Sequence, residues 1–343
     1  MMIIRPIRTA DIDAIVDLAR EAGHGMSNLP ADRDELTTRI RISGESLERA
    51  VEEPSEEFYL FVLEDRASGR IVGTSGIMCG IGRSRPFYSY KIIKRVHTSR
   101  AIGRSDTARL LQIVNEYHGV TEIGALYLTP GYRRGGFGKL LSRSRYLFLA
   151  EHPERFTDPV MAEMRGVIDD QGHSVFWDSL GRCFLHMDFS RADYLHYRGN
   201  FQIIVDLLPE YPVYTRLLPE EAQAVIGLTH PETVPALELL KREGFRFEGC
   251  INVFDGGPQL HVPRELIRTV RESDSGTITR IVDRCQGATH LVANTKLQDY
   301  RVCQSPLARS VDDEIAIEAT TATALEVDIG DRIRFVPGAA SRR

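Results

Sequence analysis

A basic, glycine-rich loop is the segment whose residue types point most directly to chemistry. Residues 133–138 read Arg-Arg-Gly-Gly-Phe-Gly and precede a segment with a helical apolar pattern. Glycines let a backbone approach a ligand closely, and a helix N-terminus offers unpaired N–H groups and a partial positive charge. The loop therefore predicts an anion site, most naturally for a pyrophosphate. The candidate binding residues are Arg133, Arg134, Gly135, Gly136, Phe137 and Gly138.

A strand before this loop and a helix after it must position the loop. Residues 123–128 suit a buried strand that Pro130 ends, and apolar residues between 140 and 149 form a helical face. The glycine spacing matches neither the dinucleotide fingerprint G-x-G-x-x-G nor the P-loop pattern. Because glycines also make ordinary turns, a structural loop that binds nothing is the alternative.

The pattern Arg133-x-x-Gly136-x-Gly138 resembles the [Arg/Gln]-x-x-Gly-x-[Gly/Ala] loop of the GCN5-related acyl-CoA N-acyltransferases. The resemblance implies that the loop amides hold the pyrophosphate of coenzyme A. It also implies that the preceding strand lines the pantetheine arm and the acyl thioester, through Leu126, Tyr127 and Leu128.

A carboxylate and a guanidinium stand two residues apart further along the chain. Glu163 and Arg165 belong to a predicted strand over residues 160–168, so their side chains are expected on the same face of it. One interpretation is that they pair with each other. The other is a polar acceptor site, in which Glu163 meets a cationic substrate or relays a proton and Arg165 holds a carboxylate.

His230 is a candidate catalyst at the junction of a loop and a helix. Pro231 keeps it out of a helical conformation, and Gly244 ends the helix that follows. A lone histidine is more often a hydrogen-bonded structural residue than a catalytic one. Both interpretations of His230 stay open on these grounds.

Composition narrows the class of protein. A length of 343 residues favours two domains, and 42% hydrophobic with 27% charged residues is ordinary for a soluble globular chain. The net charge of -5 argues against a nucleic-acid partner. Five widely spaced cysteines without a C-x-x-C pair predict neither a disulfide framework nor a metal site. Without a signal peptide or a membrane span, we expect a cytoplasmic location and no membrane partner.

The order of elements predicts an α/β (α+β) fold. A strand at residues 2–5, an amphipathic helix after Asp11, and strands at 58–63, 71–77 and 187–189 indicate a mixed, mostly antiparallel twisted sheet with helices on both faces. Short alternating segments after residue 255 predict a small barrel-like β subdomain. We therefore divide the chain into an acyltransferase domain, 1–254, and a C-terminal subdomain, 255–343.

Many short segments in order resemble the arginine N-succinyltransferase family. They are Phe61–Asp65, Pro86–Tyr88, Glu163–Gly166, Phe176–Trp177, Met187–Ser190, Tyr214–Thr215, His230–Pro231, Glu243–Phe245 and Phe254–Pro258. The resemblance implies transfer of succinyl from succinyl-CoA to the α-amino group of L-arginine, the first step of a succinylation route of arginine breakdown. It places a succinyl-CoA contact on Leu126 and a proton donor on His230.

Some expectations follow from this resemblance, and some alternatives remain. The family includes chains that act as one of two unlike subunits and chains that accept ornithine, so we expect a homo-oligomer or a hetero-oligomer with a sister subunit. The loop at 23–30, which in this fold borders the acceptor pocket, departs from its relatives by reading Met-Ser-Asn before Leu29. The rivals are an acyltransferase for another amine and a non-catalytic partner subunit.

The chemistry would need several groups beyond the cofactor loop. An amine with a pKa near or above about 8 must lose a proton before it attacks the thioester. Backbone N–H groups of the cofactor strand would stabilise the oxyanion. We assign proton donation to the leaving thiolate to His230, acceptor binding or proton relay to Glu163, and the succinyl carboxylate to Arg165.

Overall fold

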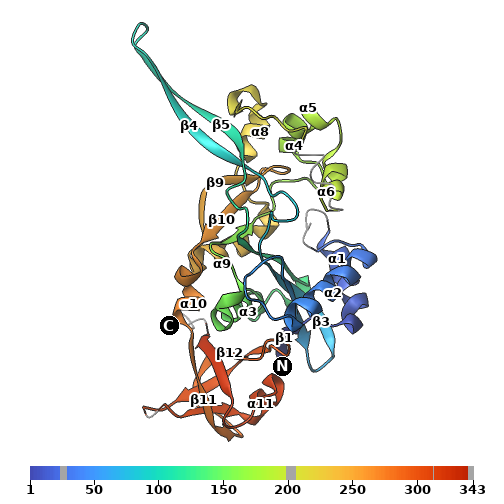
Figure 1. Ribbon diagram of the computed structural model, residues 1–343, viewed down its shortest axis with the longest axis vertical. Helices are drawn as coiled ribbons and strands as arrows, with labels where there is room; N and C mark the ends of the chain where they lie inside the picture. Colours follow the sequence, from blue (N-terminus) through green and yellow to red (C-terminus); the bar gives the residue numbers. More distant parts are fainter. Residues whose placement is uncertain (24–28, 198–205, 312, 339–343) are drawn as a thin grey trace.

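A twisted, mostly antiparallel sheet runs through the length of the molecule in the computed structural model (Figure 1). The structure describes residues 1–23, 29–197, 206–311 and 313–338. Within these residues the strands follow the order β12-β15-β11-β14-β13-β1-β2-β3-β6-β7-β10-β9-β4-β5-β8. The central strands are β1 (Met2–Pro6), β2 (Phe58–Asp65), β3 (Arg70–Met78), β6 (Thr121–Leu128), β7 (Val160–Glu163), β10 (Pro258–Val262), β9 (Arg246–Asn252), β4 (Ser89–Ser99), β5 (Arg104–Val114) and β8 (Val213–Tyr214).

Helices cover both faces of the central sheet because β2 is apolar on both sides. Its side chains alternate: Phe58, Leu60 and Val62 pack with α1 (Ile12–Ala22) and α2 (Arg33–Glu48). The intervening Tyr59, Phe61 and Leu63 pack with Leu140, Leu147 and Phe148 of α3 (Phe137–Glu151). The Asp32 carboxylate accepts hydrogen bonds from the N–H groups of Asp34 and Glu35 and so caps α2. The predicted fold class, with helices on both faces, is confirmed.

A second core supports the upper part of the molecule. It lies between β4, β5 and β9 and several short helices, namely α4 (Val175–Ser179), α5 (Gly181–Leu185), α6 (Phe189–Tyr197) and α8 (Glu220–Val225). Trp177 is fully buried in this core, stacks on Phe254 at 5.5 Å between ring centroids, and donates from its indole N–H to the Met187 carbonyl. The other helices of the described residues are α9 (Val234–Glu243), α10 (Arg268–Glu272) and α11 (Ala319–Leu325). The 3₁₀ turns there are Thr9–Asp11, Pro130–Tyr132, Pro153–Arg155, Thr215–Leu217, Pro231–Thr233 and Arg264–Leu266.

The strand predicted at residues 187–189 is wrong. Phe189 begins helix α6, because the Asp188 carbonyl accepts hydrogen bonds from the N–H groups of Arg191 and Ala192. Phe189 itself is 5% exposed and packs into the second core. Its apolar side chain reflects this burial, which occurs in helices as well as in strands.

The C-terminal segment forms a closed five-stranded barrel, as predicted. Strand β12 (Ala288–Asn294) pairs with both β13 (Val302–Arg309) and β15 (Arg332–Pro337), while β11 (Asp274–Val282) and β14 (Ile315–Glu318) complete the circle. Strand β13 also pairs with β1, which joins the barrel to the central sheet. The boundary at 254/255 stays a prediction; β10, which follows it, pairs with β7 and β9.

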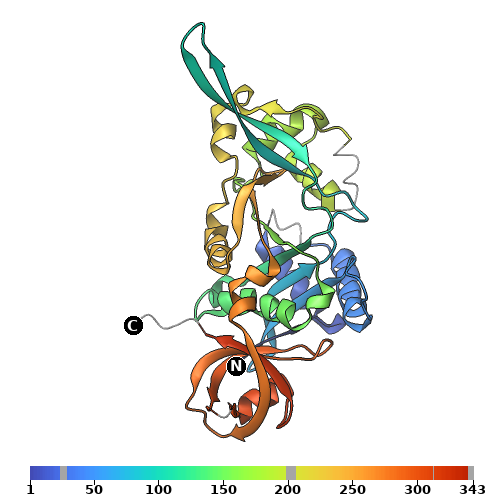
Figure 2. The ribbon, with the colours of Figure 1, turned by 60° about the vertical axis from the view of Figure 1, so that its left-hand side comes forward.

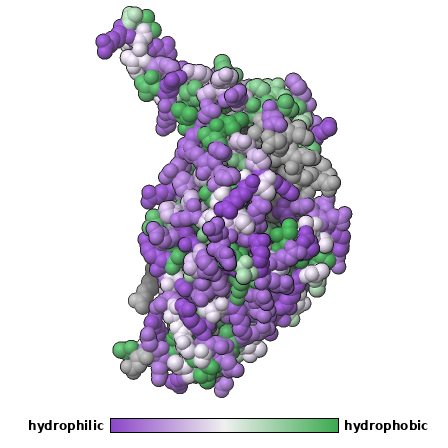
Figure 3. Space-filling model, viewed as in Figure 1, coloured by the Kyte–Doolittle hydropathy of each residue, from purple (hydrophilic) through white to green (hydrophobic). Residues whose placement is uncertain are grey.

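Two surface features complete the description. The β4–β5 hairpin projects away from the body as a long arm at the end opposite the barrel (Figure 2). The face seen in Figure 3 is largely hydrophilic, with hydrophobic residues in small separate groups. Across the described ranges, we find no helix with the length and apolar character needed to cross a membrane.

Candidate active site

The site is built where two parallel strands separate. Strands β6 and β7 pair only at Thr121 with Val160 and at Glu122 with Met161. Beyond these pairs the strands diverge, while β6 continues to pair with β3 on its other side. A parallel pair that opens in this way leaves the facing backbone edges available to a ligand.

A β-bulge shapes the β6 side of the opening. The register with β3 shifts between Thr74 and Gly76, so that Ala125 and Leu126 both lie opposite Ser75. Ala125 takes a φ of 49°, in the left-handed region that residues other than glycine rarely adopt. The Thr74 hydroxyl donates to the Ala125 carbonyl at 2.6 Å and holds this conformation. The bulge therefore interrupts the ladder at the predicted thioester contact, Leu126.

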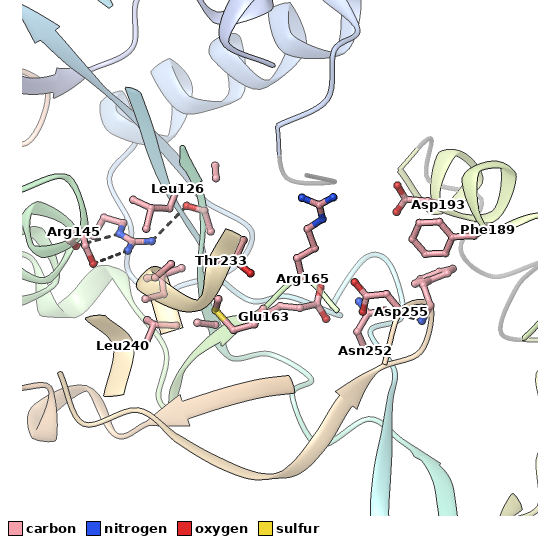
Figure 4. A pocket seen from close by; sticks show the side chains of 18 residues that line it. Leu126, Arg145, Glu163, Arg165, Phe189, Asp193, Thr233, Leu240, Asn252 and Asp255 are labelled. Carbon is pink, nitrogen blue, oxygen red and sulfur yellow. Dashed lines mark hydrogen bonds between the residues drawn. The ribbon is translucent and has the colours of Figure 1, made fainter. Parts of the chain in front are cut away.

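A cavity of about 130 Å³ lies in the opening between the two strands. Strands β6 and β7 line it together with α3, α6, α9 and the turn after β9. Figure 4 shows Leu126 and Arg145 on one side, and Arg165, Asp193 and Asp255 on the other. The polar or predicted residues that line the cavity are Leu126, Ser142, Arg145, Glu163, Arg165, Asp193, Thr233, Asn252 and Asp255.

The glycine loop lies between the end of β6 and the start of α3, as its sequence predicts. Gly135 and Gly136 have φ values of 66° and 82°, and Gly136 is the N-cap of α3. In the described part of the chain, the N–H groups of Gly135, Gly136 and Gly138 donate to no acceptor. Arg133 ties the loop to β6, because its Nε donates to the Leu128 carbonyl at 2.9 Å. The arrangement suits a phosphate-bearing ligand.

The side of the cavity away from α3 carries three carboxyl groups. Glu163 Oε1 accepts a hydrogen bond from the Gln259 amide at 2.7 Å, and burial raises the pKa of Glu163 to about 7. Burial, with the Asp255 charge, raises the pKa of Asp193 to about 6. Burial likewise raises the pKa of Asp255, although Asp255 accepts hydrogen bonds from the N–H groups of Gly166 and Gly257. Such clustered acids favour a cationic ligand.

Glu163 and Arg165 have separate partners, so the ion pair considered from the sequence is absent. Arg165 reaches Glu232 at 3.5 Å, and its Nε is buried without a partner among the described residues. Glu163 also lines a second, wider cavity of about 430 Å³ beside α2. A carboxyl group that borders both spaces can exchange protons between them.

His230 is a direct neighbour of Arg165 and lies outside the cavity. Its backbone N–H donates to the Arg165 carbonyl at 2.8 Å, and its Nδ1 accepts from the N–H of Glu232 at 3.3 Å. Burial and the charge of Arg165 lower the pKa of His230. His230 does not line the cavity, whereas Thr233, whose hydroxyl donates to the His230 carbonyl, does. The structure thus places His230 next to Arg165 and outside the space that Leu126 borders.

Two other expectations concern metal and the acceptor loop. No group of three or more His, Cys, Asp or Glu residues that could hold a metal ion occurs in the ranges that the structure describes. Most of the loop at 23–30, expected at the acceptor pocket, lies outside the described residues, which omit 24–28.

The model of the arginine N-succinyltransferase beta subunit family matches residues 2–269, and that of the family's C-terminal domain matches residues 275–337. The chain belongs to this family. Family membership confirms the family predicted from the sequence and makes the chain an acyltransferase.

Relatives in this family match over the full length. The arginine N-succinyltransferase subunit beta of Pseudomonas aeruginosa is 39% identical over 342 residues, which is 100% of both chains. The arginine N-succinyltransferase of Citrobacter koseri is 39% identical over 345 residues, covering 98% of this chain and 97% of its own. A solved structure, the arginine/ornithine succinyltransferase subunit AI from Pseudomonas aeruginosa, superposes with a TM-score of 0.88, at 34% identity and 98% coverage of each chain.

Several residues that line the cavity could not be identified from the sequence. Arg145 lies on a helix face that is typical of ordinary apolar packing, and Asp193 comes shortly after Phe189, which was assigned to a strand. Asn252 ends strand β9, and Asp255 belongs to the turn after it, whose glycines suggest only a change of direction. A charge within an otherwise apolar helical face was the one available signal for Arg145.

Proposed function

We propose that this chain is an arginine N-succinyltransferase that transfers succinyl from succinyl-CoA to the α-amino group of L-arginine. The observation that carries the proposal is a pocket with separated charges at the divergence of β6 and β7, next to the glycine loop. The substrates bring two carboxylates and one guanidinium. The pocket offers two guanidinium groups, Arg145 and Arg165, and the three carboxyl groups Glu163, Asp193 and Asp255.

The donor binds along one continuous stretch of chain. The N–H groups of Gly135, Gly136 and Gly138 hold the pyrophosphate, with Arg133, Arg134 and Phe137 around them. Leu126, Tyr127 and Leu128 line the pantetheine arm and the thioester. A backbone N–H at the bulge, at Leu126, hydrogen-bonds the thioester oxygen as negative charge develops on it.

Glu163 serves as the base for the acceptor amine. A carboxylate with a pKa of about 7 is half ionised near neutral pH and can take a proton from an ammonium group. The proton can leave through the second cavity, which Glu163 also lines. The free amine then attacks the thioester carbon.

His230 supplies a proton to the departing thiolate. The Nδ1 atom of its ring accepts a hydrogen bond from the N–H of Glu232, and the ring lies outside the cavity. Proton donation therefore requires a rotation of the ring or a bridging water. Arg165, which we predicted to hold the succinyl carboxylate, lies on the side of the carboxyl groups and there also suits the α-carboxylate of the amino acid.

The test is thiol release by the purified chain with succinyl-CoA and L-arginine, L-ornithine or no amine. Arginine-dependent release, with N2-succinylarginine as product, is the expected result. Release with ornithine alone would replace the acceptor, and no release from folded protein that binds coenzyme A would overturn the proposal for the isolated chain.

The second part of the proposal concerns assembly of the chain with further subunits. The Pseudomonas relatives are named as subunits. We therefore propose an oligomeric enzyme, and we expect gel filtration of the purified chain to give a mass above the 38.6 kDa of one chain.

A further inference from the structure

Arg145 is a buried guanidinium with no carboxylate partner. It is 2% exposed, lies on α3, and lines the cavity between β6 and β7. Its Nε donates to the Ser142 carbonyl at 3.2 Å, one Nη to the Ser142 hydroxyl at 3.2 Å and the other to the Gly124 carbonyl at 3.4 Å (Figure 4). Within the described ranges no acid lies at ion-pair distance from it.

Glu243 is the acid whose charge acts on Arg145, and its carboxylate already has other partners. The charge of Glu243 acts on Arg145, but its carboxylate accepts hydrogen bonds from the N–H and hydroxyl of Thr269 and faces Arg143 at 3.6 Å. The neutral oxygens of Ser142 and Gly124, with the Tyr146 ring centroid 5.7 Å from its Cζ atom, therefore surround the Arg145 guanidinium. A buried charge in this state is strongly unfavourable unless an anion joins it, and two of its five N–H donors remain unassigned.

We propose that Arg145 binds the terminal carboxylate of the succinyl group and so selects a dicarboxylic acyl donor. This inference rests on the proposed function and assigns the pocket's two arginines to different substrates. Arg165 lies with Asp193 and Asp255 and is already balanced by Glu232, which suits the acceptor side. Arg145 lies beside Leu126, on the donor side.

Chain geometry agrees with this assignment. The Gly124 carbonyl that Arg145 contacts is two residues before Leu126, which corresponds to about 6–7 Å along a strand. A succinyl group extends about 4 Å from its thioester carbon to its carboxylate carbon, and a hydrogen bond adds about 3 Å.

The direction is consistent as well. The glycine loop follows Leu128, so the coenzyme approaches Leu126 from the open end of the divergence. The acyl chain then points toward the closed end, where Thr121 and Glu122 pair with β7. Arg145 contacts Gly124, which lies between Leu126 and that end.

Binding of two unreactive thioethers tests this assignment without turnover. S-(3-carboxypropyl)-CoA carries the carboxylate, and S-butyl-CoA of the same chain length lacks it. We expect the wild-type chain to bind the carboxylated thioether about 10²-fold or more tightly than the neutral one. Arg145→Gln should abolish the difference, while the matched variant Arg165→Gln should retain it.

A difference that survives Arg145→Gln and disappears in Arg165→Gln would overturn the assignment. If Arg145→Gln does not fold, a crystal structure of the wild-type chain with S-(3-carboxypropyl)-CoA decides: a carboxylate on Arg145 supports the assignment, and one on Arg165 or in solvent refutes it. Preference for the carboxylated thioether in a chain that acylates no amine would instead refute the proposed acceptor chemistry and leave Arg145 as the donor anchor.

Discussion

Replacing Glu163 with Gln should slow the reaction and stabilise the protein at alkaline pH. The amide keeps an oxygen that can accept from Gln259 but cannot take a proton. Loss of a general base costs about 10²–10⁴-fold in rate, so we expect kcat near pH 7 to fall at least about 10²-fold. In the wild-type chain, activity should rise with pH and level off near the Glu163 pKa of about 7.

The variant should have a different pH profile. Without the base, only substrate that is already deprotonated reacts, so activity should continue to rise up to the amine pKa of about 8 or above. The deficit of Glu163→Gln is therefore largest near pH 7 and shrinks at higher pH. Initial rates with saturating succinyl-CoA from pH 5.5 to 9.5 measure both profiles.

The stability effect follows from the direction of the same pKa shift. Burial raises the folded-state pKa of Glu163 to about 7, from an ordinary value of 4.5. Between these values the folded state binds more protons than the unfolded state, so the wild-type chain loses stability as the pH rises. The full difference corresponds to about 3 kcal/mol, and partial exposure of the side chain reduces the expected effect to about 1–2 kcal/mol.

Urea unfolding at pH 8 and at pH 5 measures this stability effect. Glu163→Gln should be more stable than the wild-type chain at pH 8, and the gain should be smaller at pH 5. A variant with wild-type turnover and the same break near pH 7 would refute the role of Glu163 as base. A variant that is inactive but gains no stability at pH 8 would refute the raised pKa.

Three further changes address the other parts of the molecule. His230→Ala should lower turnover about 10²-fold with little change in succinyl-CoA affinity, and unchanged turnover would remove His230 from the mechanism. Gly136→Ala should weaken binding of coenzyme A about fivefold in calorimetry, because the added Cβ meets no protein atom within 4 Å and would extend into the space proposed for the pyrophosphate; unchanged affinity would contradict the loop as the pyrophosphate site. Trp177→Ala should lower the unfolding free energy by about 3–5 kcal/mol in urea titrations, since the ring is fully buried, and a loss below about 1 kcal/mol would contradict its place in the second core.

The fold and the place of the glycine loop between β6 and α3 were largely predictable because local signals specify them. The continuous apolar run of β2, the glycines at 135 and 136, and the helical apolar face of α3 each lie within one short segment. The error at residues 187–189 has the same origin. An apolar residue such as Phe189 reports burial, and burial alone does not distinguish a strand from the first turn of a helix.

The side of the cavity that Asp193, Asn252 and Asp255 line was less predictable because no single segment contains it. Asp193 comes from α6, Asn252 from the end of β9 and Asp255 from the turn after it, and they meet only when the second core packs. The resemblance to the family identified His230 by its position in the sequence but could not show where its ring lies. In the structure, His230 is next to Arg165 and outside the cavity. Long-range contacts of this kind leave no periodic trace in the sequence.

The two halves of the site should therefore differ in how mutations affect them. Leu126, the glycine loop and Arg145 lie within residues 126–145, on one strand, one loop and one helix that share the main core. Asp193 and Asp255 depend instead on α6 and on the turn that packs against Trp177. If the proposed assignment holds, donor selection would depend on the centre of the sheet, and acceptor selection would depend on how the helices of the second core pack. Divergence between arginine and ornithine as acceptors would then arise through changes in packing around α6 while the donor side stays the same.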